Sequence, residues 1–342
     1  MKTTRLGRTD LYVSRVGFGA LPIQRVDKEY AKKLLIKAYD NGINFFDTAR
    51  GYSDSEEKIG YALSDFRKNI VLATKASAKN KESFFKDLEK SLKELKTDYI
   101  DIYQFHNPPF VPGKNDDNGL LDAALLAKKK GMIRYIGISN HKLEIARKSM
   151  LSSNYDTIQF PFSMLSTDEE ADFVRECKEH DIGFIAMKAL SGGLITDASA
   201  AFAGLWRFDN VVPIWGIQKE HELDMFITLE KDPPVMDENM QKIIDGYIQE
   251  LAGEFCRGCG YCMPCPAGIP INLAARISLL LKRGRSEDFL NENFKEKMLK
   301  INDCTECGHC KECCPYGIDT PELLKKELDK YMRAFNSVKQ NF

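Results

Sequence analysis

Four side chains of complementary chemistry lie at or just after the ends of three short apolar runs in the first third of the chain. Asp47 ends I-N-F-F-D and is followed five residues later by Tyr52, Lys75 ends I-V-L-A-T-K, and His106 ends Y-I-D-I-Y-Q-F-H. A tyrosine has an ordinary pKa of about 10, and a nearby ammonium lowers that pKa because it favours the tyrosinate. We expect Asp47 to hold Lys75 charged and in place, and His106 to orient a carbonyl oxygen. The set suits protonation of a carbonyl oxygen while hydride arrives at the carbon.

Each of these residues alone also has a structural interpretation. Asp47 could cap the turn after its strand and Tyr52 could cover the next helix. Ser53–Glu56 (S-x-x-E) matches a capping box that would open that helix. The chemical interpretation gains weight because all four groups follow strand ends, which meet at one mouth in a parallel barrel.

The elements that must position these groups are short β-branched runs that alternate with amphipathic helical segments such as Glu29–Tyr39 and Lys86–Leu95. About eight such repeats in the first 230 residues predict an α/β fold, a (β/α)₈ TIM barrel. A doubly wound open sheet is the competing architecture, but the first strand-to-helix turn lacks G-x-G-x-x-G. The expected strands are Arg15–Gly19, Ile43–Thr48, Ile70–Thr74, Tyr99–Phe105, Ile133–Ile138, Thr157–Phe160, Gly183–Met187 and Val211–Trp215.

Two further segments, L-G-R-T-D-L-Y-V-S-R-V-G-F-G (Leu6–Gly19) and G-I-S-N (Gly137–Asn140), accompany the four polar groups. With them, residues 3–230 resemble the aldo-keto reductase family. The resemblance implies that Asp47, Tyr52 and the other two groups are the catalytic tetrad. It also implies a nicotinamide cofactor, usually NADPH, that lies extended across the barrel mouth.

The same resemblance assigns residues to the nicotinamide. By position, Ser139, Asn140 and Gln159 would hold the carboxamide. Many members stack an aromatic side chain on the nicotinamide ring, and the matching residue here is Met187.

The phosphate and adenosine ends of the cofactor are less clearly marked. Ser191, Gly192 and Gly193 follow the seventh strand, where a glycine-rich loop lets backbone N–H groups approach a pyrophosphate. A simple tight turn explains these glycines equally well. Gln218 and Lys219, after the eighth strand, are candidates for the adenosine end. The residues that commonly bind the 2′-phosphate in the family are poorly matched in this sequence. NADPH is therefore expected over NADH only because most members of the family use it.

Nine of the ten cysteines lie between Cys256 and Cys314, and clustered cysteines suggest metal ligands. The runs are C-R-G-C-G-Y-C-M-P-C-P and C-T-E-C-G-H-C-K-E-C-C-P, and the second has the bacterial ferredoxin spacing. Three cysteines of each run and a fourth from the other predict two [4Fe–4S] clusters. Zinc is the alternative, although runs of three cysteines fit it badly. The expected ligands are Cys256, Cys259, Cys262 and Cys314 for one cluster, and Cys304, Cys307, Cys310 and Cys265 for the other.

Two cysteines remain outside this assignment: Cys313 is expected to be a packed free thiol, and Cys177 an ordinary thiol on a barrel helix. Between the two runs the pattern is mostly helical, with predicted helices at Ile271–Arg283 and Asp288–Lys300. This tail resembles the mainly α-helical type of two-cluster ferredoxin domain, which a group of aldo-keto reductases carries. The expected domains are 1–235 (barrel), 236–253 (connecting helix) and 254–342 (ferredoxin-like domain).

Composition describes a soluble globular protein: 342 residues, 43% hydrophobic, 29% charged and a net charge of −1. Near-neutral charge gives no basic field for nucleic acid or an anionic membrane, and no apolar stretch is long enough for a span. The N-terminus lacks the apolar core of a secretory signal, so we expect a cytoplasmic protein. The proline-rich loop 107–118 either shapes a substrate pocket with Phe110 or is a surface excursion.

Two functions are compatible with these features. The first is a nicotinamide-dependent carbonyl reductase or alcohol dehydrogenase that acts on a small molecule. The second is an electron-transfer protein whose clusters serve a partner such as a ferredoxin or flavoprotein. Clusters take electrons singly whereas hydride carries a pair, and the sequence has no flavin motif, so the intact tetrad favours the enzyme.

Overall fold

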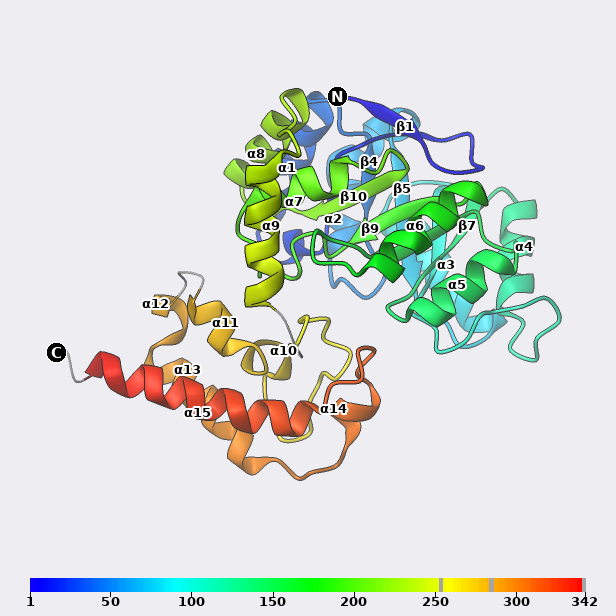
Figure 1. Cartoon of the computed structure of the whole chain (residues 1–342). Coiled ribbons are helices and arrows are strands. Elements are labelled where there is room, and N and C mark those ends of the chain that lie inside the picture. Colours follow the sequence, from blue (N-terminus) through cyan, green and yellow to red (C-terminus); the bar gives the residue numbers. More distant parts are fainter. Residues whose placement is uncertain (252–254, 283–285, 340–342) are drawn as a thin grey trace. The chain divides into compact units, whose positions relative to one another are not determined.

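The computed structural model describes residues 1–251, 255–282 and 286–339 (Figure 1). The chain divides into two compact units. The first unit comprises Met1–Ala189 and Asp197–Ile244, and the second comprises Leu190–Thr196 and Asp245–Phe342. The loop Leu190–Thr196 therefore interrupts the first unit in sequence and belongs to the second.

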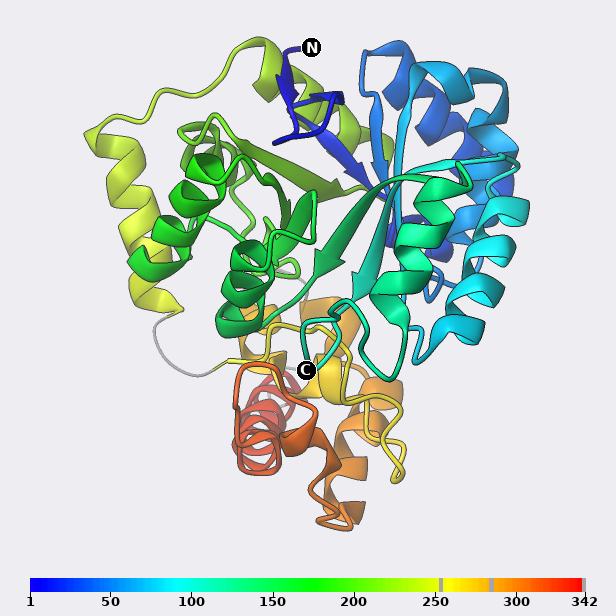
Figure 2. The same cartoon turned by 90° about the vertical axis from the view of Figure 1, so that its right-hand side faces the viewer.

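The first unit is a closed barrel of eight parallel strands, in which each strand pairs with the next along the chain and β10 pairs with β3 (Figure 2). The predicted (β/α)₈ barrel is confirmed. The first strand is shorter than expected and begins at Gly17 rather than Arg15. The barrel strands are β3 (Gly17–Gly19), β4 (Phe45–Asp47), β5 (Val71–Ala76), β6 (Ile100–His106), β7 (Ile133–Ser139), β8 (Thr157–Pro161), β9 (Gly183–Met187) and β10 (Val211–Gly216).

In the described part of the chain, eight helices alternate with the strands and cover the outside of the barrel, and a ninth, α9, begins in the first unit and ends in the second. Several begin at side-chain caps: Asn80 and Ser83 form a capping box at α3, and Thr167 and Glu170 form one at α6. The helices are α1 (Lys28–Asp40), α2 (Ser55–Leu63), α3 (Lys81–Glu94), α4 (Leu120–Lys129), α5 (Leu143–Leu151), α6 (Asp168–Glu179), α7 (Ala198–Trp206), α8 (Glu220–Lys231) and α9 (Glu238–Glu250).

The capping box expected at Ser53–Glu56 does not form. Helix α2 begins at Ser55 after Asp54, which makes no side-chain capping bond. The Glu56 carboxylate instead accepts a 2.6 Å hydrogen bond from Thr74 Oγ1 and pairs with Arg50. Buried partners on the neighbouring strand and loop thus take the carboxylate that would have capped the helix.

An antiparallel hairpin of β1 (Thr3–Arg5) and β2 (Tyr12–Ser14) precedes the barrel and was not predicted. Its apolar residues Leu6, Leu11 and Val13 are buried in one cluster with Phe45 and Val71, the first residues of β4 and β5. Burial of such side chains stabilises by about 1.5–3 kcal/mol each. The hairpin therefore closes the N-terminal end of the barrel with apolar side chains, so the polar strand ends lie at the opposite end.

Among the described residues of the second unit the regular elements are all helices, as predicted for the tail, and loops carry most of its cysteines. The helix expected at Ile271–Arg283 is two helices, because the chain turns at Ala275 and Arg276; Arg283 itself lies outside the described residues. Buried aromatic rings join α13 and α15, with Phe294 and Tyr331 centroids 5.9 Å apart. The helices are α10 (Ile271–Ala274), α11 (Ile277–Lys282), α12 (Ser286–Phe289), α13 (Glu292–Leu299), α14 (His309–Glu312) and α15 (Thr320–Lys339).

Residues 252 and 253 of the expected connecting helix, and residues 254, 284, 285 and 340–342 of the expected tail, also lie outside the described part. Within the residues that the structure does describe, none of the helices combines the length and the apolar character that crossing a membrane would require.

Candidate functional site

The centre of the candidate site is an ion pair between the ends of β4 and β5. Lys75 Nζ donates to Asp47 Oδ1 at 2.7 Å and to the Thr48 carbonyl at 2.8 Å. Their side chains are 1% and 2% exposed. Because Asp47 pairs with Ala73 in the parallel register, Lys75 extends two residues further along the same face. The strand geometry thus brings the two charges together.

Tyr52 and His106 complete the expected group. The Tyr52 ring centroid lies 5.2 Å from Lys75 Nζ. The rings of Tyr52 and His106 meet edge to face, with centroids 6.1 Å apart and planes at 88°. The structure therefore brings together all four residues that the sequence singled out.

The protonation states differ from the expectation at Tyr52. Burial and the negative charge of Asp47 raise the pKa of the Tyr52 hydroxyl far above its usual value. The predicted lowering by Lys75 is wrong because burial and the charge of Asp47, which pairs with Lys75, dominate the pKa of Tyr52. Burial and the charge of Lys75 lower the pKa of His106 to about 3. At neutral pH the site therefore presents a protonated phenol and a neutral imidazole.

Gln104, which was not predicted from the sequence, connects this group to the next strands. Gln104 Nε2 donates to Asp47 Oδ2 at 3.4 Å and to Gln159 Oε1 at 3.2 Å. Gln104 precedes His106 by two residues on β6, so both face the same side of the strand, and that spacing was the available signal. Gln104 Oε1 is buried without a hydrogen-bond partner in the described part of the chain, whereas the Gln159 side chain also bonds to Asp47. A bound polar group with a hydrogen-bond donor fits Gln104 Oε1.

The residues expected at the carboxamide lie at neighbouring strand ends. Ser139 and Gln159 are register partners on β7 and β8, and Met187 ends β9. Asn140 Nδ2 donates to the Pro108 carbonyl at 2.8 Å and so anchors the loop after β6. The position of the 107–118 loop therefore depends on Asn140, a residue of the candidate site.

Gln218 and Lys219 lie directly before α8, and the Glu222 side chain accepts hydrogen bonds from both of their backbone N–H groups. Glu222 Oε2 accepts from Gln218 N at 2.7 Å and from Lys219 N at 2.9 Å. A negative charge therefore already lies at the two N–H groups that an anionic ligand would use.

Ser191, Gly192 and Gly193 form the tight turn that the sequence allowed. Gly193 N donates to the Leu190 carbonyl at 2.9 Å, and Ser191 and Gly192 have φ of 47° and 68°. Positive φ at both central positions favours glycine, so Ser191 is held in a strained conformation. This turn belongs to the second unit.

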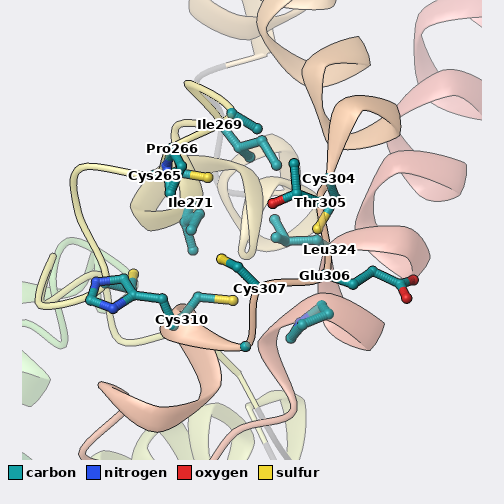
Figure 3. A pocket seen from close by; sticks show the side chains of 15 residues that line it. Cys265, Pro266, Ile269, Ile271, Cys304, Thr305, Glu306, Cys307, Cys310 and Leu324 are labelled. Atoms are coloured by element: carbon teal, nitrogen blue, oxygen red, sulfur yellow. The ribbon is translucent and has the colours of Figure 1, made fainter.

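The expected ligands of one cluster line a single cavity in the second unit (Figure 3). Cys265, Cys304, Cys307 and Cys310, the second cysteine set, all line it, together with Cys262. Burial raises the pKa of the Cys310 thiol, and its cysteine neighbours Cys304, Cys307 and Cys265 add to the rise. Mutual repulsion of this kind occurs only among thiols that lie close together.

The first cysteine set comprises Cys256, Cys259, Cys262 and Cys314. Burial raises the Cys256 pKa, and the neighbouring Cys259 and Cys314 raise it further. Burial, followed by Cys256 and Cys259, raises the Cys262 pKa to about 12. The same four cysteines that spacing grouped are therefore neighbours in space.

The grouping is looser than a single ion needs. Zinc would draw thiolates to about 2.3 Å from one point. In residues 1–251, 255–282 and 286–339, no three His, Cys, Asp or Glu side chains are placed to hold one metal ion. Cys313 lies outside both sets, with Sγ 3.6 Å from His309 Nδ1, and Cys177 is buried with Sγ 3.8 Å from Met150 Sδ.

Comparison with known proteins finds a family match for each of the two parts of the chain. Residues 15–224 match the model of the aldo/keto reductase family, and residues 255–319 match that of a 4Fe-4S dicluster domain. An uncharacterized oxidoreductase of Bacillus subtilis, YqkF, is 33% identical over an alignment of 213 positions, and the match covers 58% of this chain and 67% of YqkF. The NADH-specific methylglyoxal reductase of Escherichia coli is 30% identical over 57% of this chain and 69% of its own length.

Among solved structures, the holo form of aldo-keto reductase AKR11C1 from Bacillus halodurans is 26% identical with a TM-score of 0.63. The similarity covers 74% of this chain and 97% of that one. The chain thus spans about two thirds of the length of the curated relatives it matches. On the barrel and on the family match over residues 15–224, the protein belongs to the aldo/keto reductase family of oxidoreductases and carries a 4Fe-4S dicluster domain after its barrel.

Proposed function

We propose that the barrel reduces a small-molecule carbonyl to an alcohol, or catalyses the reverse reaction, with a nicotinamide dinucleotide. The observation that carries this proposal is the buried Lys75–Asp47 pair with Tyr52 beside it. Tyr52, whose raised pKa keeps it protonated, gives its proton to the carbonyl oxygen. Neutral His106 orients that oxygen by donating a hydrogen bond. A bound nicotinamide supplies or accepts the hydride.

The dinucleotide is proposed to bind along the strand ends. Ser139, Asn140 and Gln159 would hold the carboxamide, and Met187 would cover the ring. The buried oxygen of the Gln104 amide, which has no partner in the described part of the chain, supports this placement, because a carboxamide can donate a hydrogen bond to it. The turn at Ser191, Gly192 and Gly193 would hold the pyrophosphate, with Gln218 and Lys219 at the adenosine end.

We propose that NADH binds at least as well as NADPH. Glu222 places its carboxylate at the backbone N–H groups of Gln218 and Lys219. A 2′-phosphate near this carboxylate would be repelled. The relative from Escherichia coli is itself named as NADH-specific.

We further propose that the two cysteine sets hold two [4Fe–4S] clusters. The fit rests on eight cysteines gathered into two groups of four, each with three residues from one run and the fourth from the other. Each cluster exchanges one electron at a time, so its partner would be a one-electron carrier such as a ferredoxin or a flavoprotein.

The test is anaerobic oxidation of NADH and NADPH with methylglyoxal or a reactive aldehyde. We expect Tyr52→Phe to lower turnover by about 10²–10⁴-fold while the dissociation constant for NADH is unchanged. Tyr61→Phe is the matched control, since its hydroxyl bonds to Glu29 on the barrel exterior. Near-native turnover by the Tyr52 variant would rule out its role as the acid.

A second candidate function follows from the two cysteine sets alone. In it, the barrel mainly serves a cluster-based electron carrier, and carbonyl reduction is incidental. Bleaching of the cluster absorbance by NADH with no carbonyl present would favour this function. Equal carbonyl reduction before and after removal of iron would show instead that the barrel works alone.

A further inference from the structure

Arg276 lies at the break between α10 and α11 and joins two loops of the second unit. Its side chain is buried, with 9% of the residue exposed. Nη1 donates to the Gly192 carbonyl at 2.8 Å, and Nε donates to the Asn272 carbonyl at 3.0 Å. One guanidinium thus ties the 191–193 turn to the helical part of the unit.

Two glycines make room for this guanidinium. A Cβ at Gly192 would lie 2.7 Å from Arg276 Nη1, and a Cβ at Gly258 would lie 2.7 Å from Arg276 Cζ. Real side chains essentially never approach so closely, so neither position accepts another residue without displacing the arginine. Gly192 and Gly258 also have positive φ, at 68° and 62°. The guanidinium is held between one glycine from each loop.

The second of these loops carries cysteines of the first set. Gly258 lies between Cys256 and Cys259, and its N–H donates to Cys256 Sγ at 3.4 Å. The Arg276 guanidinium packs against Gly258, which directly precedes Cys259, so its positive charge lies beside the first cysteine set. The same side chain therefore contacts both the turn proposed for pyrophosphate and the loop that carries proposed cluster ligands.

We propose that Arg276 is a positioning residue with two separable effects. Its planar fork fixes the 191–193 turn in the conformation that receives the dinucleotide phosphates. Its charge favours the reduced form of the cluster on the first set, because reduction adds one negative charge near a cation. This inference rests on the proposed function, since it needs both a dinucleotide and a cluster to bind.

The experiment uses the full chain with its iron restored under anaerobic conditions. Arg276→Met removes both the planar set of guanidinium donors and the charge, whereas Arg276→Lys keeps the charge but loses the planar donors. Arg333→Met is the control, because Arg333 is an exposed arginine on α15 of the same unit. The readouts are the dissociation constant for NADH, from its fluorescence, and the reduction potential of each cluster, from spectroscopic titration.

We expect both Arg276 variants to weaken NADH binding by about tenfold, a loss of one charge-assisted hydrogen bond. In Arg276→Met the potential of one cluster falls while the other keeps its value; a tenfold change in that one-electron equilibrium corresponds to 59 mV. In Arg276→Lys both potentials stay near those of the unaltered protein.

Unchanged NADH binding in Arg276→Met would overturn the positioning role, and equal shifts of both potentials would overturn the local effect on the first set. If Arg276→Met fails to take up iron, Arg276→Lys still decides whether the fork matters for NADH. Failure of the unaltered protein to bind NADH would refute the proposed function itself. Normal binding that is indifferent to Arg276 would refute only this inference.

Discussion

Lys75 Nζ lies 2.7 Å from Asp47 Oδ1 in a site where neither side chain is more than 2% exposed. Burial alone would discharge both groups, raising the pKa of Asp47 and lowering that of Lys75. Their mutual attraction opposes this, and the Thr48 carbonyl and Gln104 amide satisfy further atoms of the pair. The pair is therefore stable only while both partners are present.

Lys75→Met should destabilise the barrel by about 3–5 kcal/mol, because it leaves the Asp47 carboxylate buried without a counter-ion. This value can be checked by measuring the free energy of unfolding of the barrel in a urea titration. Lys148→Met is the control, since Lys148 and Glu144 form an exposed pair that solvent screens and that contributes little to stability. Equal effects of the two substitutions would contradict the argument.

His106 should make the barrel less stable in weak acid. Its pKa is about 3 in the folded protein and about 6.5 when unfolded, so the unfolded chain binds more protons between these values. The stabilising contribution is complete above pH 6.5 and is lost as the pH falls toward 3, by up to about 1.4 kcal/mol per pH unit. Unfolding free energies of the unaltered protein and His106→Asn between pH 4 and 7 measure this difference. Parallel pH profiles would contradict the buried neutral imidazole.

Glu222→Ala should raise the affinity for NADPH relative to NADH. It removes the carboxylate that accepts from Gln218 and Lys219 N–H and frees these donors for a 2′-phosphate. We expect the ratio of the two dissociation constants to move toward NADPH by about fivefold or more, with Glu238→Ala on exposed α9 as the control. An unchanged ratio would place the adenosine elsewhere.

Cys313→Ser should leave the iron content unchanged, whereas Cys307→Ala should remove about half of it. Cys307 belongs to the set that lines the cavity, and Cys313 contacts His309 outside both sets. Iron and sulfide analysis of purified protein, with Cys177→Ser as a barrel control, decides the matter. Iron loss in Cys313→Ser would mean that the fourth ligand was assigned to the wrong cysteine of the Cys313–Cys314 pair.

Much of the barrel could be predicted because its strands are buried on both faces and read as short continuous apolar runs. Asp47, Lys75 and His106 stood out as polar residues that end such runs. Gln104 did not, because an amide inside a strand resembles an ordinary core residue, and only its spacing of two residues from His106 places it on the same face. The β1–β2 hairpin was missed because strands of three residues carry too little periodicity.

Other errors came from competition between partners. The sequence predicted that Glu56 would cap α2 and that Lys75 would lower the pKa of Tyr52. In the structure Glu56 bonds to Thr74, and Lys75 bonds to Asp47 and the Thr48 carbonyl. Which of several polar neighbours a side chain chooses depends on positions in space that spacing along the chain does not give.

The chain leaves the barrel unit after Ala189, contributes seven residues to the helical unit and returns at Asp197. The dicluster domain is therefore not a purely C-terminal segment, and a single truncation cannot remove all of it. A protein shortened after Ile244 would keep the 191–193 turn but lose Arg276, which holds it. Anyone who fuses or truncates the two units separately would consequently have to redesign the β9–α7 connection. The C-terminal junction after Ile244 would need redesign as well.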